Sequence, residues 1–254
     1  MTNVLSKTQI DRLGDRLRQG SLAESDLRLL DEHRRSFGEA YKAVVRTIRE
    51  QLHLEPSGRP AKSTPSLVEK LHRESIRLSQ VQDIAGCRVV VADVAAQDQV
   101  VASLRTAFPG ASVVDRRANP SYGYRAVHVI VQMSGKFVEI QVRTSLQHVW
   151  AEFSEKLSDS VDPGIKYGGG TSDLRDMLTS SSVTIRELEQ VEGMLADLER
   201  RLIALVRTED EGTRALLLIQ QEVIRTKFTG VKMLLVEKFN TMISSLEDAK
   251  DQKR

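Results

Sequence analysis

The segment from Asn119 to Ala151 constrains the fold most, because it holds two strand patterns separated by a short turn. Residues 127–131 and 137–143 are rich in β-branched side chains, and Ser134-Gly135 between them is typical of a hairpin turn. The second pattern alternates between apolar residues at 138, 140 and 142 and polar residues at 139, 141 and 143. Such alternation predicts a strand with one buried face and one polar face.

A two-residue turn at Ser134-Gly135 would also fix how the strands pair, since pairs are counted outward from the turn. The expected pairs are Ile130 with Glu139, His128 with Gln141, and Ala126 with Arg143. Opposed residues share a face, so one face would gather five functional groups: Tyr124, His128, Glu139, Gln141 and Arg143. This pattern indicates either a binding surface or an ordinary solvated face, and the strands alone leave both open.

The composition is that of a soluble protein with an ordinary core. The chain has 254 residues, of which 40% are hydrophobic and 28% are charged. It shows no apolar run of membrane-spanning length and no signal-peptide core, so we expect a cytoplasmic protein that does not bind a membrane. The single cysteine, Cys87, cannot form an internal disulfide and is interpreted as a buried structural thiol. A net charge of +2 does not require a nucleic-acid partner.

The patterns along the chain predict an α/β (α+β) fold in three parts. Residues 1–54 form an N-terminal helical segment, and residues 55–60 are a loop by composition. Residues 55–170 form an α/β domain with strands at 87–91 and 111–114, the hairpin, and helices at 97–108 and 145–157. We expect a mixed sheet of about four to five strands flanked by helices, with the lone Trp150 in the core.

Residues 171–254 are predicted to form a long antiparallel helical hairpin. Apolar residues recur at spacings of three and four on both sides of a turn at 209–212. The apolar seam needs a surface to cover it, and the surface is either the α/β domain of the same chain or another subunit. A homo-oligomer formed through helices is therefore expected.

Residues 62–70 could bind polyphosphate. Thr64 is a plausible N-cap with Pro65 at the first helical position, which puts Ser66 in the first turn, where backbone N–H groups favour anions. Lys70 lies four residues later on the same face, and Lys62 approaches from the loop. Taken alone, these residues could equally be a solvated helix start.

Asp83 stands directly before the strand at 87–91. A carboxylate at the edge of a strand can bind Mg²⁺, which prefers hard oxygen ligands and keeps most of its waters. Aspartate is also common as the cap of a turn, so the position alone leaves both roles open.

Taken together, these segments resemble the RelA/SpoT alarmone synthetases, which transfer pyrophosphate from ATP to the 3′-hydroxyl of GDP or GTP. The matching segments are Lys62-x-x-x-Ser66-x-x-x-Lys70, Asp83 to Arg88, Gly123-Tyr124-Arg125-Ala-Val-His128, and Glu139-Ile-Gln141-Val-Arg143-Thr followed by Trp150-Ala151. Four segments in the family's order are far more specific than any one of them. The resemblance covers roughly residues 35–170.

The resemblance implies a role for each matching residue. The ATP phosphates would be bound by Arg59, Lys62, Ser66, Lys70 and Arg88. Asp83 would bind Mg²⁺, and Glu139 would either share that ion or take the proton of the acceptor hydroxyl. Tyr124 would stack on the acceptor base, while Arg125, His128, Gln141 and Arg143 would contact or position the acceptor. This set of groups suits phosphoryl-type transfer, in which the protein mainly positions groups and neutralises charge.

The chain also departs from the family pattern. Pro60 stands where family members often have an arginine, with Arg59 one step earlier, and residues 152–157 lack the usual Glu-His pair. No His-Asp hydrolase motif precedes the matching region, so we expect a small synthetase with no degrading activity.

Two other functions remain open at this stage. Some small members of the family resemble toxins that modify the 3′ end of tRNA, and Arg34-Arg35, Arg116-Arg117 and Arg200-Arg201 could contact an RNA backbone. The third possibility is a catalytically silent module that binds nucleotide or a partner. The pair of carboxylates, Asp83 and Glu139, argues against it, because a silent module does not need both.

Overall fold

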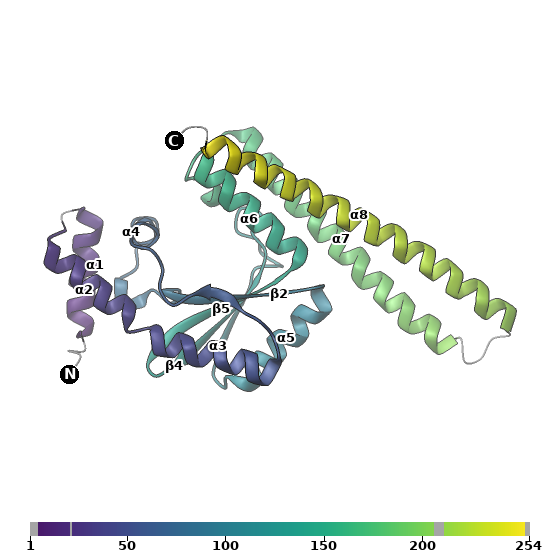
Figure 1. Cartoon of the computed structure of the whole chain (residues 1–254), viewed down its shortest axis with the longest axis horizontal. Coiled ribbons are helices and arrows are strands. Elements are labelled where there is room, and N and C mark those ends of the chain that lie inside the picture. Colours follow the sequence, from purple (N-terminus) through teal and green to yellow (C-terminus); the bar gives the residue numbers. More distant parts are fainter. Residues whose placement is uncertain (1–4, 21, 206–210, 252–254) are drawn as a thin grey trace. The chain divides into compact units, whose positions relative to one another are not determined.

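The computed structural model describes residues 5–20, 22–205 and 211–251, except the side chains of residues 202–205, 214 and 249–251 (Figure 1). The chain divides into two units, and each is described by itself below. The first contains Met1–Val89, Gln99–Val114 and Val127–Val142. The second contains Val90–Asp98, Asp115–Ala126 and Arg143–Arg254.

Three helices open the first unit, as the sequence predicts for its N-terminal segment. They are α1 (Lys7–Gln19), α2 (Glu24–Arg35) and α3 (Gly38–Leu52). Ser6 and Gln9 form a capping box at the start of α1, and Gly20, with φ of 71°, ends that helix in the left-handed conformation that glycine adopts without strain. The α1 helix then packs against α4 (Thr64–Arg73) and the short helix η1 (Leu78–Gln80).

The sheet has five strands in the order β1-β2-β5-β4-β3. Their bounds are β1 (Ser57–Arg59), β2 (Ala85–Val91), β3 (Ser112–Asp115), β4 (Val127–Met133) and β5 (Lys136–Thr144). Helix α5 (Val94–Ala107) lies between β2 and β3 in the sequence. The expected α/β fold with a mixed sheet is therefore confirmed.

The prediction of a loop at residues 55–60 is wrong for its central part. Ser57–Arg59 form the edge strand β1, which pairs antiparallel with β2. Prolines flank the segment and Gly58 is inside it, so the composition resembles a loop. The glycine has a structural reason, because a Cβ at Gly58 would lie only 2.4 Å from the carbonyl oxygen of Gly86.

The hairpin has the register that the sequence predicts. Ile130 pairs with Glu139 and His128 pairs with Gln141 in the antiparallel ladder. Ser134 and Gly135 both have positive φ, 51° and 73°, as expected of the turns that join two twisted strands closely. The alternate residues of β5 and β4 are buried, and with α3 they form the core of this unit; its fully buried members include Val44, Ile48, Val129, Val138 and Ile140.

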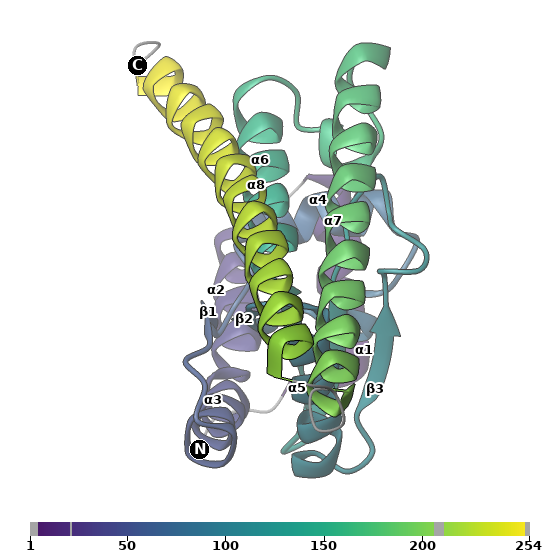
Figure 2. The same ribbon diagram turned by 90° about the vertical axis from the view of Figure 1, so that its right-hand side faces the viewer.

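The second unit is mainly helical. It contains α6 (Ser145–Ser160), the short helix η2 (Ile165–Tyr167), α7 (Ser172–Leu205) and α8 (Glu211–Asp251). The two long C-terminal helices that the sequence predicts are present. Figure 1 shows α7 and α8 extending along each other, and Figure 2 shows that they are close at one end and diverge toward the other, with α8 also packing on α6. The predicted turn at 209–212 lies mostly outside the described residues.

The core of the second unit forms around α6. Its buried members are Leu146, Trp150, Ala151, Phe153, Leu157, Ile165, Leu178, Ile185 and Phe239. Trp150 is 3% exposed and its indole N–H donates to the carbonyl of Leu178 at 3.2 Å, so the prediction of a core tryptophan is confirmed. Among the residues that the structure describes, no helix is long and apolar enough to cross a membrane.

Candidate functional site

Asp83 lies between two lysines in the first unit. Lys62 Nζ is 2.8 Å from Asp83 Oδ2, and Lys70 Nζ is 2.9 Å from Asp83 Oδ1. The backbone N–H of Lys62 also donates to the carbonyl of Ile84 at 2.7 Å, which fixes the loop that carries this lysine. The structure therefore brings together three residues that the sequence predicts as phosphate and metal ligands.

The charge balance of this cluster keeps Asp83 ionised. Burial opposes ionisation, since the side chain is only 18% exposed, but the charges and hydrogen bonds of Lys62 and Lys70 outweigh it and lower the pKa of the carboxyl group. Two ammonium groups flank the carboxylate of Asp83, and the more exposed Glu74 lies 3.7 Å from Lys70 Nζ. An incoming anion such as a polyphosphate would be favoured there.

The start of α4 differs by one residue from the prediction. Ser63, not Thr64, is the N-cap: its backbone is extended, with φ of −65° and ψ of 152°, and its Oγ accepts a hydrogen bond from the backbone N–H of Ser66. Helical dihedral angles begin at Thr64, so the cap moves back by one position. Ser66 stays in the first turn, and its Oγ accepts a hydrogen bond from Ser63 Oγ at 2.8 Å.

Glu139, on β5, is held by two neighbours in the same unit. His128 Nδ1 lies 2.8 Å from Glu139 Oε1, and the Gln141 amide donates to Oε2 at 2.7 Å. The antiparallel register explains this arrangement, because His128 lies opposite Gln141 and one pair away from Glu139. The predicted cluster of an imidazole, a carboxylate and an amide is present.

The environment of Glu139 favours its charged form. Burial raises the pKa of the carboxyl group and the charge of Asp83 raises it further, but the hydrogen bonds and charge of His128 with the Gln141 hydrogen bond lower it by more. The two carboxylates, Asp83 and Glu139, are thus within electrostatic reach of each other. Cys87 is buried, as predicted, and burial followed by the charge of Glu139 raises its pKa to about 12, so it stays a thiol.

The two arginines predicted to bind ATP lie on the edge strand β1 and on its neighbour β2. Arg59, on β1, is exposed and lies opposite Gly86. Arg88, on β2, is half-buried and lies opposite Ser57. Both are in the same unit as the lysine cluster, on the two strands that pair beside it.

The remaining predicted acceptor residues belong to the second unit. Arg143, at the end of β5, is almost fully buried and donates to the hydroxyl of Tyr124 at 3.0 Å. Its guanidinium carbon is 5.0 Å from the centre of the Tyr124 ring, a distance at which a cation interacts with the π face. The ring is therefore held at both its hydroxyl and one face.

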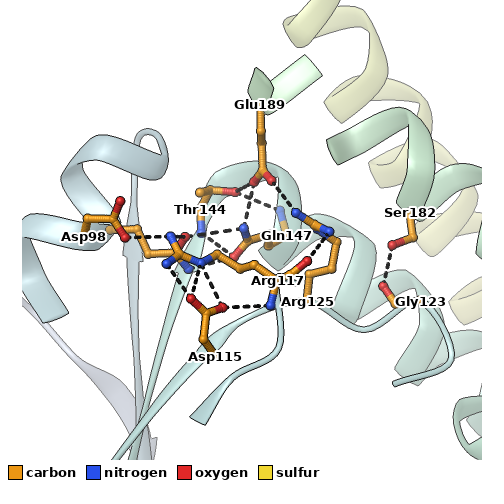
Figure 3. A network of polar contacts seen from close by, with 10 residues as sticks. Asp98, Asp115, Arg117, Gly123, Arg125, Thr144, Gln147, Ser182 and Glu189 are labelled. Carbon is orange, nitrogen blue, oxygen red and sulfur yellow. Dashed lines mark hydrogen bonds and ion pairs between the residues drawn. The ribbon is translucent and has the colours of Figure 1, made fainter. Parts of the chain in front are cut away.

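Arg125 takes part in a buried polar network that the sequence analysis missed (Figure 3). It donates to the carbonyl of Arg117 at 2.7 Å and to Glu189 on α7 at 3.4 Å. Glu189 also accepts hydrogen bonds from Thr144 and Gln147. The role of Arg125 in acceptor binding stays a prediction, and its neighbours identify Glu189 as a further residue of interest.

A signal for Glu189 was present in the sequence. Leu178, Ser182, Ile185 and Glu189 follow one another at spacings of four, three and four, and all are buried on one face of α7. A carboxylate on the apolar stripe of a helix needs a buried partner, because an unpaired buried charge is costly. Its partners could not be predicted, since they lie 42 to 64 residues earlier in the chain.

The carboxylates of the first unit fit a magnesium ion. Within residues 5–20, 22–205 and 211–251, no group of three or more His, Cys, Asp or Glu side chains could hold a metal. Mg²⁺ does not need such a group, because in phosphate sites one or two carboxylates, waters and the phosphates themselves complete its ligands. Asp83 and Glu139 supply hard, ionised oxygens of the required kind.

A known protein family matches the part of the chain that contains the lysine cluster and the two carboxylates. Residues 58–158 match the model described as a region found in RelA / SpoT proteins. They include the lysine cluster, both carboxylates and Tyr124. Residues 58–158 are therefore a RelA/SpoT-family domain, as the four motifs suggest.

Two curated relatives from mycobacteria carry the description "uncharacterized protein". The protein Rv1366 of Mycobacterium tuberculosis and the protein Mb1401 of Mycobacterium bovis are each 37% identical to this chain over 142 residues, which is 54% of this chain and 50% of the relative. The chain thus spans about half the length of the curated relatives it matches.

Solved structures share the fold. Small alarmone synthetase 1 from Bacillus subtilis is 25% identical, with a TM-score of 0.51, covering 70% of this chain and 100% of that one. The same enzyme bound to its product pppGpp gives 24% identity, a TM-score of 0.52 and the same coverage. A GTP pyrophosphokinase family protein from Streptococcus pneumoniae is 24% identical, with a TM-score of 0.51, covering 69% and 95%.

Proposed function

We propose that this chain transfers the β,γ-pyrophosphate of ATP to the 3′-hydroxyl of GDP or GTP, forming the alarmones (p)ppGpp. The observation that carries the proposal is the pair of ionised carboxylates, Asp83 and Glu139, within one unit of a RelA/SpoT domain. Asp83 is held by two lysines and Glu139 by an imidazole and an amide. The similarity to small alarmone synthetase 1 from Bacillus subtilis supports the same chemistry.

ATP would be bound by the basic residues of the first unit. Lys62 pairs with Asp83, and Lys70 pairs with Asp83 and, at 3.7 Å, with Glu74. Each ammonium group has three N–H donors and can donate further hydrogen bonds to phosphate oxygens. Ser66 adds a hydroxyl in the first turn of α4, where the helix dipole favours anions. Arg59 and Arg88 complete the proposed donor set.

Asp83 and Glu139 would hold Mg²⁺ with the phosphates. When bound, the ion supplies positive charge that neutralises the transferring group. Asp83 would hold the ion through its carboxylate oxygens, and Lys62 and Lys70 would donate to the phosphate oxygens.

The proposed reaction is an in-line displacement. The 3′-oxygen of the acceptor bonds to the β-phosphorus of ATP, the bond from that phosphorus to the α–β bridging oxygen breaks, and AMP leaves with the bridging oxygen. The hydroxyl proton passes to Glu139 and then to solvent. A strong base is not required, because in a loose transition state the acceptor proton is lost late, and an ionised, oriented carboxylate is sufficient.

The acceptor nucleotide would be bound through the residues that the resemblance names. Tyr124 is proposed to stack on the guanine base, and Arg125 and Arg143 to contact the acceptor. His128 and Gln141 would orient Glu139 toward the 3′-hydroxyl, since each is hydrogen-bonded to one of its oxygens. Orientation of this kind accounts for much of the rate in transfer reactions of this class.

The arginine clusters give little support to the tRNA alternative, because several of these arginines already pair with carboxylates. Arg117 pairs with Asp98 and Asp115, Arg35 pairs with Asp31, and Arg200 and Arg201 both pair with Asp197. An arginine that already pairs with a carboxylate contributes less to binding of a phosphate backbone. The silent-module alternative is disfavoured by the two ionised carboxylates.

The proposal is tested by measuring AMP release from ATP and Mg²⁺ with one acceptor at a time. We expect release with GDP or GTP that changes little between about 50 and 200 mM salt, whereas a tRNA-directed enzyme would lose activity steeply over that range. Release only with deacylated tRNA would support the toxin alternative. Absence of release with every acceptor, from folded protein, would favour the silent module.

Self-association through the helical hairpin and a cytoplasmic location are also part of the proposal. Large apolar side chains are exposed along α7 and α8, among them Met194, Leu216, Ile219, Met233 and Leu234. Helices of this length are stabilised mainly by packing of their apolar faces, which a second copy would supply. Light scattering coupled to size-exclusion chromatography tests this, and a monomer at micromolar concentration would contradict it.

A further inference from the structure

We propose that Glu189 and Ser182 of α7 are positioning residues for acceptor binding, which hold the loop that carries Tyr124 in its working geometry. The inference rests on the proposed function, because that function gives Tyr124 its role. It adds two residues outside the matched RelA/SpoT region, both on the C-terminal hairpin. All the contacts concerned lie within the second unit.

Glu189 has a complete set of buried donors. Its side chain is 3% exposed and accepts hydrogen bonds from Thr144 Oγ1 at 2.7 Å, Gln147 Nε2 at 2.8 Å and Arg125 at 3.4 Å. A buried carboxylate is stable only when it is paired and hydrogen-bonded in this way. The geometry therefore makes Glu189 the point where α7, the loop and the end of β5 are joined (Figure 3).

The contacts continue from Glu189 to the beginning of the loop. Arg125 also donates to the carbonyl of Arg117 at 2.7 Å. The guanidinium of Arg117 lies 2.6 Å from Asp115 and 2.7 Å from Asp98, at the start of α5. The two arginines thus fix the loop from residue 115 to residue 125.

Ser182 provides a second attachment on the same helix. Its hydroxyl donates to the carbonyl of Gly123 at 2.6 Å (Figure 3). Ser182 and Glu189 are seven residues apart, so they lie two turns from each other on one face of α7. Gly123 and Arg125 are the two residues that flank Tyr124, and each is bonded to α7.

Close packing limits movement of the same loop. A Cβ on Gly123, which has φ of +87°, would lie 2.7 Å from the ring of Trp150, so the backbone is in contact with the indole. The hydroxyl and one face of Tyr124 are held by Arg143. These contacts fix Tyr124 before a ligand arrives. Stacking of an acceptor base therefore costs less conformational entropy of the tyrosine and its loop.

The test compares three substitutions on one helix. Glu189→Gln keeps the size of the side chain and removes the charge that pairs with Arg125, and Ser182→Ala removes the milder attachment. Glu187→Gln is the matched control, because Glu187 is an exposed glutamate two residues from Glu189. Circular dichroism and thermal unfolding establish that each variant is folded.

The expected result is a selective loss of acceptor affinity. We expect Glu189→Gln to raise the KM for GDP roughly ten- to a hundredfold, as for a small misplacement remote from the reacting atoms, and Ser182→Ala to raise it less. The KM for ATP should stay near that of the wild type, since the proposed ATP ligands lie in the first unit. Equal changes in both KM values, or a loss of kcat alone, would overturn the proposal, as would an unchanged KM for GDP.

Trp150 gives a readout that does not depend on transfer. It is the only tryptophan in the sequence, and Gly123 covers its ring. We expect acrylamide to quench its emission more strongly in Glu189→Gln and Ser182→Ala than in the wild type or in Glu187→Gln. Unchanged quenching in the first two variants would overturn the role of α7 in holding the loop. If the wild type transfers nothing, the proposed function fails, while the quenching still decides whether α7 holds the loop.

Discussion

Glu139 and Glu189 are glutamates that accept hydrogen bonds through both oxygens, but their surroundings differ. Glu139 is 14% exposed and is held by an imidazole and an amide, with Asp83 within electrostatic reach. Glu189 is 3% exposed and is held by a guanidinium, a hydroxyl and an amide. The first has partial access to solvent and pairs with an imidazole, while the second is enclosed and pairs with a guanidinium.

This difference indicates that Glu139 is suited to take part in the reaction and that Glu189 is suited to hold neighbouring residues in place. A carboxylate that reacts must keep a lone pair for a substrate or an ion, and it must be reached by them. A carboxylate that already pairs with an arginine in an enclosed site has no such capacity, and its removal acts through the residues that it holds. Substitutions at the two carboxylates and at their surroundings test this distinction.

Glu139→Gln is expected to lower kcat by about 10² to 10⁴-fold, the range found when a group that handles a proton is removed. Glutamine keeps the size of the side chain and can still accept a hydrogen bond from His128, so the fold should be unchanged. Steady-state transfer from ATP to GDP measures the effect, with Glu189→Gln as the comparison. Near-normal turnover in folded Glu139→Gln, or a greater loss of kcat in Glu189→Gln, would break the distinction.

Lys62→Met and Lys70→Met are expected to raise the KM for ATP. Each substitution removes one charge-assisted hydrogen bond to phosphate, worth about 1.5 to 3 kcal/mol, which corresponds to roughly ten- to a hundredfold in affinity. Lys42→Met is the control, because Lys42 is exposed on α3 and pairs with Glu39. An unchanged KM for ATP in both variants would remove the lysine cluster from the donor site.

Asp83→Asn tests the charge balance of that cluster through acid stability. The folded-state pKa of Asp83 lies below its ordinary value of 3.8, so its pairing stabilises the fold above that pH and is lost as the pH falls through the lowered pKa. The substitution should therefore lower the free energy of unfolding by about 1.5 to 3 kcal/mol at pH 7. Urea unfolding at several pH values measures the difference from the wild type, which should shrink as the pH falls below 3.8 and through the lowered pKa. A difference that does not depend on pH would show that the charge of Asp83 is not what stabilises the cluster.

Two glycine substitutions compare the edge strand with the helical hairpin. Gly58→Ala should destabilise the fold by about 1 to 3 kcal/mol, because its Cβ would meet the backbone of Gly86 and Cys87. Gly193→Ala should stabilise it by about 0.5 to 1 kcal/mol, since Gly193 is inside α7 with nothing within 4 Å of its Cβ position. Denaturant midpoints measure both changes. The same sign for both would contradict the close approach at β1.

The parts that the sequence predicts are those fixed by local patterns. The alternation in β5 and the turn at Ser134-Gly135 determine the register, and the register brings His128 and Gln141 to Glu139. The strand β1 was predicted as a loop because a glycine required by close packing resembles a glycine required by a turn. The sequence predicts Thr64 as the N-cap of α4, whereas the structure has Ser63, because serine and threonine are both good caps and stand next to each other here.

Long-range polar contacts could not be predicted in the same way. Glu189 lies on an apolar stripe, which indicates that it is buried, but nothing local indicates Arg125, Thr144 or Gln147 as its partners. The sequence motifs indicate a role for each of Asp83, Lys62 and Lys70, but they do not indicate that the aspartate pairs with the two lysines. This pairing brings together the loop after β1, the last turn of α4 and the segment before β2, and Lys62 and Asp83 are 21 residues apart in the sequence.

The central claim is that the group transferred from ATP is the β,γ-pyrophosphate and that its acceptor is a guanine nucleotide. The most direct test uses ATP labelled separately at the β and γ positions, with GDP, GTP, ATP and deacylated tRNA offered one at a time. We expect both labels to reach GDP or GTP together and in equal amounts. Transfer of the γ label alone, transfer only to tRNA, or no transfer from folded protein with Mg²⁺ would contradict it.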